Sequence, residues 1–342
     1  MSRGPSHAGR LPHWERLAFA LVFTLMAAFV ADVTISAVRQ YPANPALPGR
    51  PGSAGGPVPA VLRPPVRTPA GLLGGGGGGG GSADVSGPVL QDSPDQELRT
   101  ALAPVLARGQ GQLAVGIVDL TTGVRALYAG DRSYPAAGIA AADILAAVLL
   151  RHQGSARPLS RSDRELARQM IEDGSRTATA RMWQAAGAGG GLGEANARLR
   201  LAHTDLGGSP YRDLSRTTAA DQLRLLGDFT AAASPLSARS RSFALSLLLH
   251  VAPGQAWGVA EAAAPGTRSA VKAGQQADGS GRPQLWLTDS IGVVQRDGQV
   301  LLIAVLGTAQ PSPTAGMDTD EAAAVAAAAM IVRSAPSRQF AG

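Results

Sequence analysis

The chain has 342 residues, a formal net charge of +6 and no cysteine. Disulfides, thiolate metal sites and a cysteine nucleophile are therefore excluded, and the five histidines are too widely spaced to indicate a metal site. Seven arginines against two acidic residues within residues 1–67 account for most of the positive charge. The rest of the chain is close to neutral, which argues against a nucleic-acid-binding protein. We expect neither a metal nor a cofactor.

Residues 17–38 form an apolar segment that follows Arg3, Arg10 and Arg16. As a helix this segment would be about 33 Å long, which is enough to cross a bilayer. The preceding arginines predict that residues 1–16 stay in the cytoplasm and that the rest faces outward. We therefore expect a single-pass signal-anchor in the cell membrane. A cleaved signal peptide, followed by secretion, is the alternative.

Residues 39–94 are rich in proline and glycine and include eight consecutive glycines at 74–81. Such a composition predicts a flexible linker. The glycine run follows no predicted strand, so it carries no dinucleotide-binding signal. The sequence therefore predicts one extracytoplasmic domain at residues 95–342.

Within this domain, apolar periodicity predicts helices and strands in the order helix, two strands, a long helical insert, three strands, helix. Asp297-Gly298 is a strong hairpin signal between the last two strands, and the glycine-rich segment 187–193 is expected to be an interhelix loop. The pattern indicates an α/β (α+β) fold, in which terminal helices cover one face of an antiparallel five-stranded sheet and an all-helical lobe forms a cleft with it. The predicted helices are 94–107, 138–151, 162–186, 194–201, 217–232, 235–250 and about 319–333, and the predicted strands are 113–120, 124–129, 268–273, 285–294 and 300–306.

Several segments of the domain occur together in a familiar order and spacing. They are LAVGIVDLTTG at 113–123, YPAAGIAAADILAAVLL at 134–150, MIEDGSRTATARMW at 170–183, TTAADQLRLL at 217–226, QAWGVAEAA at 255–263, AVKAG at 270–274 and DSIGVV at 289–294. Together they resemble the class A β-lactamases and the wider family of penicillin-recognising serine hydrolases. The resemblance implies a serine β-lactamase-like fold over residues 95–342.

The first catalytic motif of that family is Ser-x-x-Lys at the start of a helix. Residues i and i+3 share a helix face, so the lysine amine can reach and activate the serine hydroxyl. The matching positions here are Gly138 and Ala141, so the resemblance implies that nucleophile and lysine are both lost. If the cleft is otherwise intact, the double variant Gly138→Ser, Ala141→Lys would recover acylation by β-lactams.

The other two motifs are degenerate in different ways. Gly174, Ser175 and Arg176 occupy the positions of Ser-Asp-Asn, and Ser175 lies one position out of register. The third motif, Lys-Thr-Gly, reads Lys272-Ala273-Gly274 and keeps the cation and the glycine. Lys272 is the only lysine of the chain, and its two interpretations are a solvated charge on an edge strand and an anion-binding residue.

No residue clearly matches the acid that would activate a deacylating water. Asp205, Asp213, Glu172 and Asp173 are all more simply interpreted as surface or helix-end carboxylates.

The resulting hypothesis is a catalytically inactive, membrane-anchored β-lactamase-like protein of the cell envelope. It would bind a cell-wall peptide, another carboxylate ligand or a protein partner, with Lys272, Ala273 and Gly274 as candidate ligand-binding residues. Two alternatives remain open. One is an active serine hydrolase that uses another nucleophile, such as Ser175 or Ser290. The other is a structural envelope protein in which the fold serves as a spacer.

Overall fold

The computed structural model describes residues 92–334, apart from residues 110, 154, 156–157, 208–214 and 280–283. The predicted membrane segment at residues 17–38 and nearly all of the predicted linker lie outside this part of the chain. No helix within the described part is long and apolar enough to cross a bilayer.

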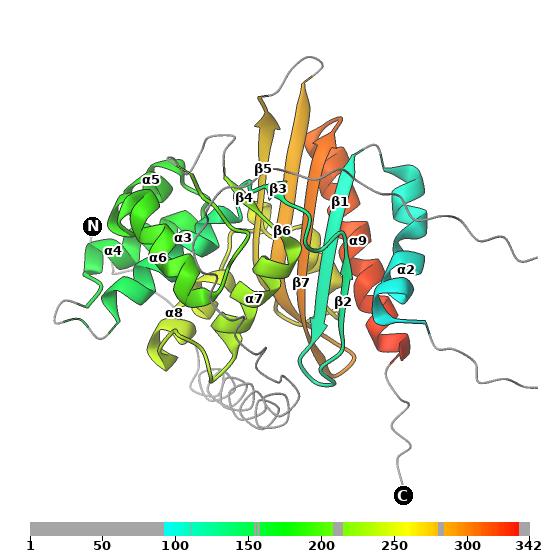
Figure 1. The fold of residues 1–342 in the computed structure, drawn as a ribbon, viewed down its shortest axis with the longest axis horizontal. Coiled ribbons are helices and arrows are strands. Elements are labelled where there is room, and N and C mark those ends of the chain that lie inside the picture. Colours follow the sequence, from blue (N-terminus) through cyan, green and yellow to red (C-terminus); the bar gives the residue numbers. More distant parts are fainter. Residues whose placement is uncertain are drawn as a thin grey trace, which may run out of the picture. The chain divides into compact units, whose positions relative to one another are not determined.

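A five-stranded antiparallel sheet forms the centre of the described domain, with the strand order β2-β1-β7-β6-β5 (Figure 1). This arrangement confirms the predicted sheet. The β6–β7 hairpin turns at Asp297 and Gly298, whose φ angles of 49° and 77° are both positive, as a tight hairpin turn requires. The strands are β1 (Gln112–Asp119), β2 (Arg125–Tyr128), β5 (Ala270–Asp278), β6 (Leu285–Arg296) and β7 (Gln299–Gln310).

The two terminal helices, α2 (Pro94–Arg108) and α9 (Pro313–Ser334), cover one face of the sheet (Figure 1). Leu98 and Leu102 of α2 are fully buried against α9 and the strands. The part of α9 that faces the sheet is built largely from alanine, which lets the helix pack closely. A separate apolar cluster fills the opposite face, between the sheet and the helical lobe.

The helical lobe is built around α3, which is buried along most of its length. Serine or threonine side chains cap the starts of α4, α5, α7 and α8, so the helix boundaries follow local sequence signals. The helices of the lobe are α3 (Ala140–His152), α4 (Arg161–Ile171), α5 (Arg176–Ala185), α6 (Ala188–Leu199), α7 (Ala219–Thr230) and α8 (Ala238–Leu248). Two short 3-10 helices, η1 (Pro253–Gln255) and η2 (Gly258–Ala262), lead back to β5.

Three differences from the sequence-based prediction concern the number or type of elements, apart from shifted bounds such as those of β5 and α9. The single helix predicted at 162–186 is two helices, because Gly174 has a φ of +67° and Ser175 starts a new helix. The predicted loop at 187–193 lies mostly within α6. A short strand pair, β3 (Tyr134–Pro135) with β4 (Arg216–Thr217), was not predicted.

The glycines of α6 serve packing rather than loop formation. A Cβ on Gly191 would lie 2.0 Å from the carbonyl oxygen of Ala186, and one on Gly189 would lie 3.1 Å from that of Gly207. These two positions therefore require glycine despite its poor helix propensity, whereas Gly190 and Gly193 have open space at their Cβ positions.

Candidate functional site

Gly138, the position that matches a serine nucleophile, lies directly against β5. A Cβ built on Gly138 would be 2.8 Å from the Cα of Gly274, and a Cβ on Gly274 would be 2.2 Å from the Cα of Gly138. Real Cβ atoms do not approach other backbone atoms so closely. The two backbones therefore occupy the space in which a side chain at position 138 would have to fit.

Ala141, at the position of the motif lysine, begins the buried face of α3. It is 5% exposed and belongs to the apolar cluster of the helical lobe. The start of α3 thus carries neither a hydroxyl group nor an amine at the two positions that the family's mechanism requires.

Lys272 lies on the edge strand β5, but its side chain is only 2% exposed. The interpretation as a solvated surface charge is therefore wrong. The ammonium group donates a hydrogen bond to the carbonyl oxygen of Ala273, and burial lowers the pKa of Lys272 to about 8. The same carbonyl group lies 3.3 Å from the Cβ position of Gly138. Lys272 is thus beneath the Gly138–Gly274 contact, and in this arrangement a ligand could not reach it from solvent.

The second degenerate motif, Gly174 to Arg176, begins α5. A Cβ on Gly174 would lie 2.9 Å from the side-chain oxygen of Gln255, so Gln255 covers this position. The hydroxyl group of Ser175 accepts a hydrogen bond from the backbone N–H of Ala178 at 3.3 Å and caps the helix. Ser175 therefore has a structural contact of its own, and Arg176 next to it is exposed.

Ser290, the other alternative nucleophile, is on β6 and is completely buried. Its hydroxyl group accepts a hydrogen bond from the N–H of Val259 at 2.9 Å and donates one to the carbonyl oxygen of Trp257 at 3.0 Å. A nucleophile needs access to substrate and a base to remove its proton. Through these two hydrogen bonds, Ser290 instead connects the start of η2 to the sheet.

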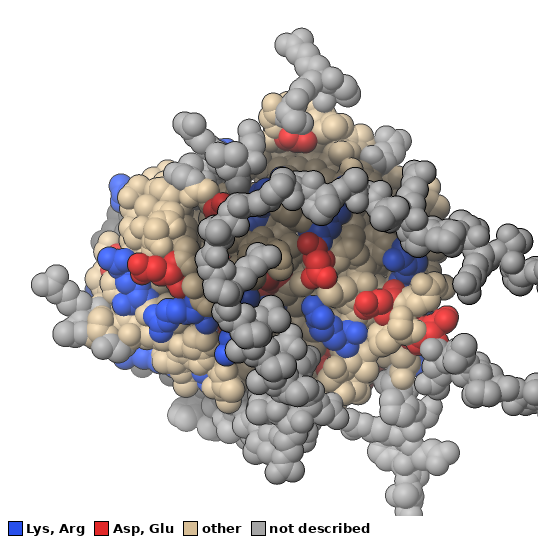
Figure 2. Space-filling view, in the orientation of Figure 1, with Lys and Arg blue, Asp and Glu red and all other residues tan. Residues whose placement is uncertain are grey.

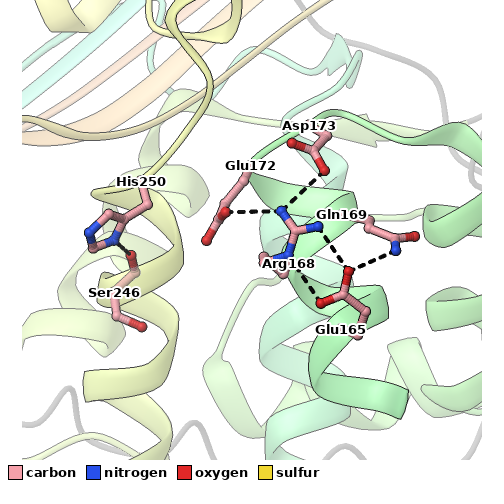
Figure 3. Close-up of polar contacts among 7 residues, drawn as sticks. All are labelled: Glu165, Arg168, Gln169, Glu172, Asp173, Ser246 and His250. Carbon is pink, nitrogen blue, oxygen red and sulfur yellow. Dashed lines mark hydrogen bonds and ion pairs between the residues drawn. The ribbon is translucent and has the colours of Figure 1, made fainter. Parts of the chain in front are cut away.

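The acidic residues at the end of α4 surround one arginine (Figure 3). Arg168 contacts Glu165 at 2.8 Å and both Glu172 and Asp173 at 3.3 Å. Its hydrogen bonds lower the pKa of Glu165 to about 2. Glu172 and Asp173 are thus ion-paired carboxylates at a helix end, whereas Asp205 is exposed and accepts a hydrogen bond from Gly207 at 2.7 Å. Asp213 lies outside the described residues.

A buried polar network, which the sequence did not reveal, connects α3 to α7. The amide of Gln222 lies 3.3 Å from both carboxyl oxygens of Asp143 and donates to Thr217 at 3.0 Å. Thr217 contacts Thr204, and Thr204 donates to Asp221 at 2.9 Å. Burial raises the pKa of Asp143 to about 7. The only sequence signal was an acidic residue within an otherwise apolar helix.

Two further carboxyl groups are buried on opposite faces of the sheet. Asp289 of β6 accepts a hydrogen bond at 2.6 Å from the N–H of Ala137, which lies in the loop that leads to α3. Asp320 of α9 is completely buried, and neither of its oxygens has a hydrogen-bond partner among the described residues. Burial raises the pKa of Asp289 to about 8. Burial, and then the charge of Asp289, raise the pKa of Asp320 well above its usual value.

The structure thus brings Gly138, Lys272, Ala273 and Gly274 together, and it places Gly174 and Ser175 against Gln255 and the first turn of α5. Within the described residues, no three metal-ligating side chains gather at one point. Figure 2 shows one face of the molecule, on which acidic and basic side chains of the described residues are interspersed. The arrangement holds the segment before α3 against β5, and of the two serines considered as alternative nucleophiles, Ser175 caps α5 and Ser290 is buried.

No protein-family model matches the sequence, and no curated protein matches it. Solved structures do match the fold. A β-lactamase from Burkholderia vietnamiensis has a TM-score of 0.61 and 18% identity, over 69% of this chain and 97% of that protein. PBP-A has a TM-score of 0.60 and 17% identity, over 70% of this chain and 96% of that protein.

A third likeness is to a representative of class A β-lactamases from Bacteroides cellulosilyticus DSM 14838. Its TM-score is 0.59 at 13% identity, over 70% of this chain and 99% of that protein. The matched share of this chain is about that of the domain predicted at residues 95–342. The domain therefore has a class A β-lactamase-like fold.

Proposed function

We propose that the chain is a membrane-anchored, extracytoplasmic β-lactamase-like protein without hydrolase activity, which acts in the cell envelope by binding. The observation that carries this proposal is the contact between Gly138 and Gly274. Gly138 carries no hydroxyl group, and a Cβ at this position would lie 2.8 Å from the Cα of Gly274, which leaves no room for a nucleophilic side chain. A PBP-A variant was solved as an acyl-enzyme complex with penicillin-G, and the present chain lacks the serine hydroxyl at the matching position.

The binding partner that we propose is a cell-wall peptide or an envelope protein. Lys272 remains the candidate contact for a carboxylate, but the Gly138–Gly274 contact would have to open before a ligand could reach it. The arginines before residue 17 and the apolar segment 17–38 support an outward-facing, membrane-held domain.

The test is intact-mass spectrometry of the full chain after incubation with penicillin G and a panel of other β-lactams. We expect no covalent adduct from folded protein. Loss of the nucleophile alone costs on the order of 10⁶-fold in turnover in a serine protease. An adduct that maps to any serine of the domain would contradict the proposal and support the active-hydrolase alternative.

Restoring the motif residues is expected to fail, in contrast to the expectation from the sequence. In the double variant Gly138→Ser, Ala141→Lys, the new serine Cβ would meet the backbone of Gly274 at 2.8 Å. The lysine would also enter a position that is 5% exposed. We expect this variant to be less stable and to remain unacylated by penicillin G, as measured by thermal unfolding and intact mass. Acylation of a folded double variant would show that the cleft is open.

A further inference from the structure

The helical lobe contains a cavity that is separate from the degenerate site. It has a volume of about 380 Å³ and lies between the end of α3, the start of α4 and the start of α8. This volume is within the range of small-molecule sites, which is roughly 300–1,000 Å³. In Figure 1 these three helices all belong to the helical lobe, to the left of the sheet.

Apolar side chains form much of the cavity lining. Leu149 of α3 is 3% exposed, and Leu159 and Phe243 are half-buried. Gln153 also lines the cavity, but its amide is already engaged. Its oxygen accepts from the Ser237 N–H at 2.7 Å, and its nitrogen donates to the carbonyl oxygen of Pro235 at 2.6 Å. The inner part of the cavity therefore favours an apolar group.

Among the described residues of the lining, the charged ones are basic. Arg164 and Arg239 are exposed at the cavity, and neither forms an ion pair with a described residue. His152 also contributes to the lining. The nearby carboxylate of Asp163 accepts hydrogen bonds from the N–H and hydroxyl groups of Ser160 as part of the capping box of α4.

The N-terminus of α8 reinforces this positive potential because its first turn carries no acidic residue, whereas Asp163 already occupies the first turn of α4. Both α4 and α8 have 11 residues and begin beside the cavity, at Arg161 and Ala238. The aligned peptide dipoles of each helix favour negative charge near its first turn. Free guanidinium groups bind carboxylates with paired hydrogen bonds.

We propose that this cavity binds a small molecule that has an apolar body and a single carboxylate. The apolar body contacts Leu149, Leu159 and Phe243, and the carboxylate lies between Arg164 and Arg239. The inference goes beyond the proposed function, because it requires neither the closed state of the Gly138–Gly274 contact nor any absence of hydrolysis.

The test is isothermal titration of 4-phenylbutyrate into the full chain held in nanodiscs of zwitterionic lipid, with empty nanodiscs as the blank. We expect saturable binding that is at least ~10-fold weaker in the double variant Arg164→Ala, Arg239→Ala, because two charge-assisted hydrogen bonds are lost. Arg181→Ala, an exposed arginine of α5 away from the cavity, is the matched control and should bind like the unchanged chain.

Two comparisons separate this site from non-specific binding. The uncharged 4-phenylbutanol and the short butyrate should each bind more weakly than 4-phenylbutyrate. Leu159→Trp, which fills the cavity from its half-buried wall, should abolish binding while circular dichroism confirms the fold. Absence of saturation, or equal affinity of the unchanged chain and the double arginine variant, would overturn the inference. Neither result would bear on the β-lactam test.

Discussion

At Gly274, the backbone of Gly138 takes the place that a side chain would fill. The Cβ of an alanine there would lie 2.2 Å from a Cα and 2.3 Å from a backbone nitrogen, which cannot rotate away as a flexible side chain could. We predict that Gly274→Ala lowers the free energy of unfolding by about 1–3 kcal/mol, the usual cost of overpacking. Urea unfolding of the full chain, followed by tryptophan fluorescence, measures the change.

Gly227 provides a matched control for this substitution. It is in the interior of α7, and no heavy atom lies within 4 Å of its Cβ position. Gly227→Ala should therefore raise the free energy of unfolding by about 0.5–1 kcal/mol through helix propensity. If Gly274→Ala did not lower the free energy of unfolding, the close contact between Gly138 and Gly274 would not exist in solution.

Single residues also show how far the sequence could predict the site. That Gly138 and Ala141 carry neither a hydroxyl group nor an amine was evident from their identities. The burial of Lys272 was not evident, because an edge strand is usually exposed and the elements that pack against this one come from other parts of the sequence. The sequence did not indicate that Asp289 and Asp320 are buried, because the burial of a carboxyl group depends on elements distant in the sequence.

Among the secondary-structure elements, those with strong periodicity were predicted and those that depend on packing were not. The strands β1, β6 and β7 and the helices α2 and α7 lie within a few residues of their predicted ranges. The errors occur at Gly174 and at the glycines of α6, where contacts with Gln255 and with the Ala186 carbonyl group decide the backbone. The pair β3–β4 is only two residues long on each strand, too short to give a periodic signal.

The start of α5 depends on the Ser175 hydroxyl group. Ser175→Ala removes the side-chain cap to Ala178 and should lower the free energy of unfolding by about 0.5–2 kcal/mol. Ser175→Asp is the conservative control, because a carboxylate also caps helix N-termini. Chemical denaturation measures both variants. A loss of stability with the alanine variant that aspartate does not restore would argue against the capping role.

At the scale of the whole molecule, ionisable groups in the interior link stability to pH. Burial raises the pKa of Asp143 to about 7 and of Asp289 to about 8, and it raises that of Asp320 well above its usual value. In the unfolded chain such groups release their protons near pH ~4. From there to pH ~8 the native state holds more protons than the unfolded state, so the free energy of unfolding falls as pH rises.

Lys272 acts in the opposite direction at higher pH. Burial lowers its pKa to about 8, so above that pH the native state releases a proton that the unfolded chain keeps up to pH ~10.4. In that range the Lys272 contribution to the free energy of unfolding rises with pH. The contributions of Asp289 and Lys272 therefore oppose each other near pH ~8, where each group is about half protonated, and the fall in the free energy of unfolding weakens there.

Urea unfolding of the full chain from pH ~5 to pH ~9 measures this dependence. We expect the descending slope to be smaller in Asp289→Asn and in Asp320→Asn, because each removes one titrating group worth at most ~1.4 kcal/mol per pH unit. Asp131→Asn, at an exposed position, is the control and should leave the slope unchanged. A free energy of unfolding that rises steadily from pH ~5 to ~8 would mean that these carboxyl groups are hydrated or paired in solution.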